Sequence, residues 1–173
     1  MTPEATDSGA VDLRIRPYAT GSIAIGAPAT TFALAEAQNG LFTFSADAGE
    51  LVSVAITSVT GACAVQFLKP DGSSLTSSYT VSGPVGFRLN PLPSSGAYTI
   101  AVRSTTTPAL AISMLLSYPL TGTIVPDGVT TTRFDSRPAQ FGVYTFEGAA
   151  GSWQGATLAW CSPERRSVGT HAR

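Results

Sequence analysis

Very few residues of this sequence could do chemistry. His171 is the only histidine, and it stands in an irregular C-terminal stretch, so a Ser-His-Asp arrangement has no partner geometry to rest on. Gly-x-Gly-x-x-Gly and Walker-type phosphate loops are absent from the sequence. Arg165 and Arg166 form too short a basic run for a nucleic-acid patch. We therefore predict no catalytic residues, no enzymatic activity and no nucleic-acid partner.

The acidic residues and the cysteines do not specify a metal site. Asp47 and Glu50 flank a tight turn; they could bind a cation together, although two solvated carboxylates are the ordinary interpretation. The aspartate of Lys69-Pro70-Asp71-Gly72 is interpreted as a turn former, because proline fixes φ there and glycine tolerates positive φ. Cys63 and Cys161 show no metal-ligand spacing, and a disulfide between them stays an open alternative. We predict no metal site and no cofactor.

The composition describes a weakly charged, globular chain. Charged residues make up 12% of it, about half of the roughly 25% of an average domain. A net charge of −1 provides no basic field for nucleic acid or an anionic membrane. The 17 glycines and 12 prolines indicate many turns between short strands. No apolar run approaches the ~20 residues that span a bilayer, so we expect no membrane insertion.

The polar surface favours an extracellular or cell-surface setting. Lys69 is the only lysine, and serine and threonine must supply much of the polar surface, as in a secreted protein rather than a cytosolic enzyme. Residues 1–18 lack the apolar and basic regions of a signal peptide. An export signal is therefore expected outside this chain.

The sequence contains an internal repeat of about 100 residues. Thr20-Gly21 recurs as Thr121-Gly122, which is 101 residues further on. Leu41–Phe44 recurs as Val143–Phe146, which is 102 residues further on. The other matches are Ala48-Gly49 with Ala150-Gly151, Thr30-Thr31 with Thr131-Thr132, and residues 11–18 with residues 110–119.

We therefore divide the chain into four parts. They are the terminal strand of a preceding repeat (1–19), a complete repeat (20–120), the truncated start of a following repeat (121–160) and an irregular tail (161–173). Glu147 takes the place of Ser45 of the complete repeat, so it is not a repeated ligand. The abrupt end of the β pattern after Trp160 suggests either a truncated or frame-disrupted gene product or a natural polar tail.

Within the complete repeat, short alternating segments predict strands. Leu51–Ile56 alternates apolar and small residues with a period of two, and Ala97–Arg103 alternates even more clearly. About seven or eight such strands, without a convincing helix, predict an all-β fold, an antiparallel β-sandwich of the jelly-roll or immunoglobulin-like type. The segment Ala109–Ser117 could also be helical on periodicity alone. The aromatic side chains expected to fill the core are Phe42, Phe44, Phe67, Phe87 and Tyr98.

Three ordered segments of this repeat resemble the bacterial pre-peptidase C-terminal domain. They are Phe42-Thr43-Phe44 with Ala48-Gly49 and Val52-Ser53-Val54, then Leu68-Lys69-Pro70-Asp71-Gly72-Ser73-x-Leu75, then Leu92-Pro93-x-x-Gly96-x-Tyr98-Thr99-Ile100-x-Val102. The resemblance covers residues 20–118, with a second copy beginning near Thr121. It implies a β-sandwich that is a non-catalytic appendage of secreted proteins. Some relatives bind calcium through acids near the start of the module, but residues 20–39 carry only Glu36, so calcium dependence is not carried over.

Two functions follow from these expectations. The first is a non-catalytic structural or spacer repeat of a secreted or cell-surface bacterial protein, with the neighbouring repeats as its partners. The alternative is a module that binds a carbohydrate or a matrix protein, with a glycan or an extracellular protein as the partner. Trp153 or Trp160 could stack on a sugar if exposed, although a place in the core or at a sandwich edge is the ordinary interpretation.

Overall fold

The computed structural model describes residues 15–105, 109–125 and 137–148. These ranges contain strands and no helix, so none of them could cross a membrane as a helix. The all-β class expected from the sequence is confirmed. The strands are β1 (Ala19–Ser22), β2 (Thr30–Leu34), β3 (Gly40–Ala46), β4 (Ser53–Val59), β5 (Cys63–Leu68), β6 (Tyr79–Val81), β7 (Val85–Arg88), β8 (Gly96–Ser104), β9 (Leu110–Ser117), β10 (Leu120–Thr123) and β11 (Gly142–Thr145).

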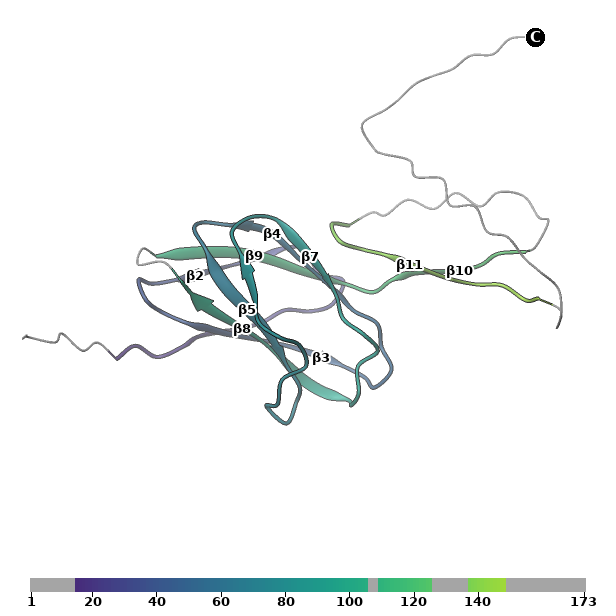
Figure 1. Cartoon of the computed structure of the whole chain (residues 1–173), viewed down its shortest axis with the longest axis horizontal. Helices are drawn as coiled ribbons and strands as arrows, with labels where there is room; N and C mark the ends of the chain where they lie inside the picture. Colours follow the sequence, from purple (N-terminus) through teal and green to yellow (C-terminus); the bar gives the residue numbers. More distant parts are fainter. Residues whose placement is uncertain (1–14, 106–108, 126–136, 149–173) are drawn as a thin grey trace, which may run out of the picture.

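The first nine strands form a sandwich of two sheets, and β10 and β11 form a separate pair at one end of it (Figure 1). The strand order is β1-β3-β8-β5-β6 in one sheet and β2-β9-β4-β7 in the other. Neighbouring strands of the sandwich are antiparallel, except that β1 runs parallel to β3. This pair is parallel because the chain leaves the first sheet after β1, forms β2 in the second sheet and then returns as β3.

The core lies between the two sheets and follows the alternation of the sequence. Every second residue of β5, beginning with Cys63, is buried, as expected where side chains point alternately to opposite faces. The aromatics predicted for the core are fully buried, with one exception. That exception, Phe87, is only partly buried and forms a T-shaped contact with the Phe67 ring, with the ring centroids 5.4 Å apart.

The sandwich has more strands than the seven or eight expected from the sequence. The strands that were not predicted are β1, β2 and β6, and all three lie at the edge of a sheet. They are short, and alternation over so few residues is a weak signal. The helical alternative for Ala109–Ser117 is wrong, because Leu110–Ser117 forms β9 between β2 and β4. All three residues of its Met114–Leu116 run are buried, which explains the unbroken apolar pattern.

The strands β1 and β10 begin close to the predicted starts of the two repeats. β1 begins at Ala19 and β10 at Leu120, each one residue before the start predicted from the sequence. The strand expected over residues 11–18 lies partly outside the described residues, and residues 15–18 form no strand. A single strand needs a neighbour for its backbone hydrogen bonds, and the described residues supply none to this segment.

Candidate functional site

The acidic side chains singled out in the sequence form turns. The Glu50 carboxylate accepts a hydrogen bond of 2.9 Å from the backbone N–H of Asp47 and closes the turn between them. Partial burial and the neighbouring Glu50 carboxylate raise the pKa of the Tyr118 hydroxyl. The Asp71 carboxylate accepts hydrogen bonds from the hydroxyl and the backbone N–H of Ser73, at 2.6 and 2.8 Å, and these lower its pKa. Asp71 is thus placed as a turn former.

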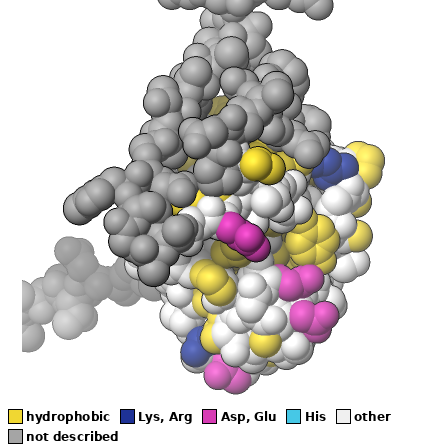
Figure 2. Space-filling model, turned by 90° about the vertical axis from the view of Figure 1, so that its right-hand side faces the viewer, with side chains coloured by type: hydrophobic (Ala, Val, Ile, Leu, Met, Phe, Trp, Pro, Cys, Tyr) yellow, Lys and Arg dark blue, Asp and Glu magenta, His cyan; other side chains and the backbone are white. Residues whose placement is uncertain are grey.

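The structure gathers no metal-binding cluster within residues 15–105, 109–125 and 137–148. Glu147 is exposed, and the acidic side chains of the face in Figure 2 are few and mostly set among uncharged ones. Several residues considered in the sequence lie outside the described residues, namely Trp153, Trp160, Cys161, Arg165, Arg166 and His171.

Cys63 is buried in the core at the start of β5, and this burial raises the pKa of its thiol. A partner sulfur would therefore have to enter the core to reach it. We expect the Cys161→Ser chain, with Cys63 as its one thiol, to react with a thiol reagent at least about a thousandfold more slowly than the unfolded chain, because the reagent must wait for the sandwich to open. Labelling followed by mass spectrometry in buffer and in urea measures the ratio; fast labelling of the native chain would contradict the burial.

The feature that stands out is the pair β10–β11, which repeats the pairing of β1–β3. β1 and β3 are parallel, with Ala19 opposite Gly40 and Ser22 opposite Thr43. β10 and β11 are also parallel, with Leu120 opposite Gly142 and Thr123 opposite Thr145. The partners of the second pair thus stand 101 and 102 residues after those of the first pair. We call β1–β3 the first strand pair and β10–β11 the second strand pair.

The turn before the second strand of each pair, β3 or β11, is also repeated, and the repeat includes one side-chain hydrogen bond. The Gln38 side-chain amide donates to the backbone carbonyl of Pro17 at 2.9 Å, and the Gln140 amide donates to that of Tyr118 at the same distance. The residue before each glutamine, Ala37 or Ala139, has a positive φ of 55° or 58°. An alanine with positive φ is uncommon, so its recurrence indicates that the two turns have the same backbone conformation.

This repeated turn was not predicted, although the sequence carries its signal. The run Ala37-Gln38-x-Gly40 recurs as Ala139-Gln140-x-Gly142. Each glycine makes room for the aromatic ring two residues later. A Cβ on Gly40 would lie 2.6 Å from the Phe42 ring, and one on Gly142 would lie 2.5 Å from the Tyr144 ring.

The turn before β11 holds the second strand pair against the sandwich. The Arg137 guanidinium donates hydrogen bonds to the backbone carbonyls of Gly26 and Ala27, the latter at 2.9 Å. Ala139 packs so closely on Gly86 of β7 that no side chain would fit there. The guanidinium of Arg88, also on β7, lies 4.1 Å from the centre of the Phe141 ring, a cation–π contact. We call these three contacts the junction.

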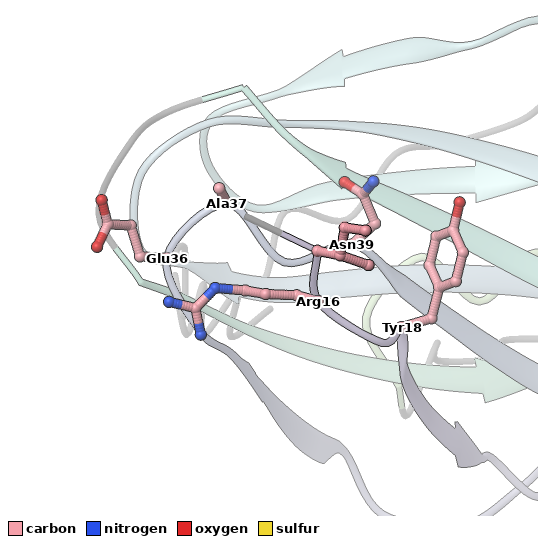
Figure 3. A pocket seen from close by; sticks show the side chains of 6 residues that line it. Arg16, Tyr18, Glu36, Ala37 and Asn39 are labelled. Carbon is pink, nitrogen blue, oxygen red and sulfur yellow. The ribbon is translucent and has the colours of Figure 1, made fainter. Parts of the chain in front are cut away.

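The matching positions of the first strand pair line a pocket. Ala37 and Asn39 hold the positions of Ala139 and Phe141, and they line a shallow pocket with Arg16, Tyr18 and Glu36 (Figure 3). In that view Arg16 and Glu36 extend on one side and Tyr18 on the other. Among the described residues, the positions that touch the sandwich in the second pair therefore line a pocket in the first.

We expect the Arg137→Ala chain to release the second strand pair from the sandwich. The loss of charge-assisted hydrogen bonds should speed amide exchange in β10 and β11 by about tenfold or more, while exchange in β8 stays unchanged. Hydrogen–deuterium exchange with mass spectrometry measures both. Arg103→Ala, which removes an exposed arginine of β8, is the control. Equal exchange in the two variants would show that Arg137 does not hold the junction.

Comparison with known proteins finds likeness in solved structures alone. No family model matches the chain, and no curated protein matches it. The pre-peptidase C-terminal domain of a collagenase from Bacillus anthracis has 10% identity and a TM-score of 0.44, and the match covers 60% of this chain and 99% of that domain. PliG, a periplasmic inhibitor of g-type lysozyme, has 15% identity and a TM-score of 0.38 for the Aeromonas hydrophila protein, over 58% of this chain and 99% of that one. PliG of Salmonella Typhimurium has 17% identity and a TM-score of 0.38, over 57% and 98%. The first of these is a domain of the kind that residues 20–118 resemble in their motifs.

Proposed function

We propose that this chain is a non-catalytic structural part of a secreted or cell-surface protein, in which sandwich modules follow one another as spacers. The observation that carries the proposal is the second strand pair, which repeats the register, the turn and the glutamine hydrogen bond of the first pair. Residues 20–120 are then one complete module, and residues 121–160 begin the next.

The connection between the modules supports a spacer rather than a flexible tether. Only Tyr118 and Pro119 separate β9 from β10. Flexible linkers are longer and rich in glycine and serine. The junction adds the Arg137 hydrogen bonds and the packing of Ala139 on Gly86, so successive modules would keep a fixed orientation. A spacer has to keep the domains on either side of it in a fixed orientation. A short connection that is held by side-chain contacts does so.

A glycan and collagen array, probed with the full chain with and without calcium, tests the proposal. We expect no reproducible binding at micromolar concentrations under either condition. Binding at micromolar concentration would replace the spacer role by a role in recognition.

One observation favours that second candidate, a carbohydrate- or matrix-binding module. Tyr79 of β6 is 40% exposed at the margin of the sandwich, with its ring centroid 5.1 Å from that of Phe87. An exposed aromatic ring on a packed support can stack on a sugar. If the array finds a glycan, Tyr79→Ala should abolish its binding, with Tyr18→Ala as the control at another exposed tyrosine.

A further inference from the structure

We propose that the outer edge of β11 accepts an extended strand of the β8 type, added antiparallel to it. This inference rests on the proposed function, because it takes the second strand pair as the start of a second module. Strand addition to an open sheet edge is a common mode of recognition, in which main-chain hydrogen bonds give affinity and side chains give specificity.

The backbone of β11 has one edge without a partner among the described residues. Leu120 and Ile124 donate hydrogen bonds to the carbonyls of Phe141 and Thr145, each at 2.8 Å, so these carbonyls face β10. Backbone groups alternate in direction along a strand, so those of Gly142, Tyr144 and Phe146 face the other side. Within residues 15–105, 109–125 and 137–148, no strand pairs with that side.

The first strand pair shows which partner fits this edge. The corresponding side of β3 is filled by β8, which runs antiparallel with Val102 opposite Gly40, Ile100 opposite Phe42 and Tyr98 opposite Phe44. The matching register on β11 places a valine opposite Gly142, an isoleucine opposite Tyr144 and a tyrosine opposite Phe146. The partner is therefore a strand that presents a tyrosine followed by two β-branched residues on one face.

The exposure of Phe146 identifies the side chain that the partner must supply. Phe44, its counterpart in the sandwich, is only 2% exposed and stacks on Tyr98 with ring centroids 5.5 Å apart. Phe146 is 55% exposed. An aromatic side chain opposite Phe146 would cover the ring and gain both apolar burial and stacking.

A peptide with the sequence of Ser95–Ser104 tests the inference on the full chain. Its binding is followed by NMR titration of the amide signals. We expect saturable shifts at Gly142, Tyr144 and Phe146 and none along β3, whose edge already holds β8. The Phe146→Ala chain should bind the peptide several-fold more weakly, because it lacks the ring that the peptide tyrosine covers.

Two N-methylated peptides make the test specific for strand pairing. The N–H at the Ile100 position faces the acceptor strand, whereas the N–H at the Thr99 position points away from it. Methylation at the Ile100 position should weaken binding by at least about tenfold, because it removes a hydrogen bond and adds a clash. Methylation at the Thr99 position should leave the affinity within about threefold of the unmodified peptide.

Several results would overturn the inference. They are the absence of saturation at millimolar peptide, equal effects of the two methylations, shifts confined to other strands, and dimers paired through β11 that the peptide does not disperse. The array described above does not involve this edge, so a failure of the inference and a failure of the proposed function give different results.

Discussion

Replacing Tyr98 by alanine is expected to lower the free energy of unfolding by about 3–5 kcal/mol, the usual cost of deleting a large buried aromatic side chain. Tyr98 is fully buried on β8 and stacks on Phe44. Small domains are stable by only about 5–15 kcal/mol, so this loss would remove a large part of the total.

The Tyr98 hydroxyl has a separate role, which the Tyr98→Phe chain isolates. It donates a hydrogen bond of 2.6 Å to the carbonyl of Ser94 and accepts one of 3.2 Å from the N–H of the same residue. Phenylalanine keeps the packing but leaves both groups of Ser94 without this partner, which should cost about 1–3 kcal/mol.

Urea unfolding of the two variants, followed by circular dichroism, separates packing from hydrogen bonding. The slope of the unfolding free energy against urea should not change, since both variants keep the same fold. Phe87→Leu is a useful comparison, because Phe87 is only partly buried at the margin of the core. If the two Tyr98 variants lose the same stability, the hydroxyl and not the ring anchors this corner of the sandwich.

The motif residues that resemble the pre-peptidase C-terminal domain serve the fold, which explains why their pattern says little about chemistry. Gly96 has a φ of 143°, a region that side chains rarely adopt, and a Cβ there would lie 2.9 Å from the Pro70 ring. Gly96, the first residue of β8, and the proline of the Pro70-Asp71-Gly72 turn therefore pack on each other. Asp71 in turn binds Ser73 within its own turn.

The strands that were predicted best from the sequence are those with a neighbouring strand on both sides. β8 lies between β3 and β5, so every second residue must be apolar, and its alternation is clear. β2 and β6 have a neighbour on one side only, and their sequences are correspondingly less constrained. The parallel direction of β1 against β3 is set by the path of the chain between sheets, which side-chain alternation does not encode.

The candidate site was accessible to sequence analysis only in part. The repeated Thr-Gly and aromatic segments located both strand pairs, and the recurrent Ala-Gln run could have located both turns. The junction could not be found in this way, because Arg137 binds carbonyls about 110 residues away, and any residue type carries a carbonyl. Ala35, the counterpart of Arg137 in the first pair, shows that the junction is not part of the repeated pattern.

The two glycines that precede the aromatic residues of β3 and β11 offer a paired test of how far the copies differ. Gly40 is buried, and a Cβ there would meet the Phe42 ring at 2.6 Å and Leu34 at 3.3 Å. The Phe42 ring is itself fully buried and stacks on Phe32 with centroids 4.0 Å apart, so it has no free space to move into. Gly40→Val is therefore expected to destabilise the sandwich by about 3 kcal/mol, at the upper end of the usual cost of overpacking.

Gly142→Val adds the same atoms at the equivalent position of the second strand pair, with a different expected result. A Cβ there would meet the Tyr144 ring at 2.5 Å, but Gly142 is exposed and the ring is only partly buried. The ring can swing toward solvent, so the sandwich should keep its stability within about 0.5 kcal/mol. Urea unfolding monitored at β8 by hydrogen exchange measures both variants. Equal losses would mean that the second strand pair is packed as tightly as the first, which its exposed Phe146 argues against.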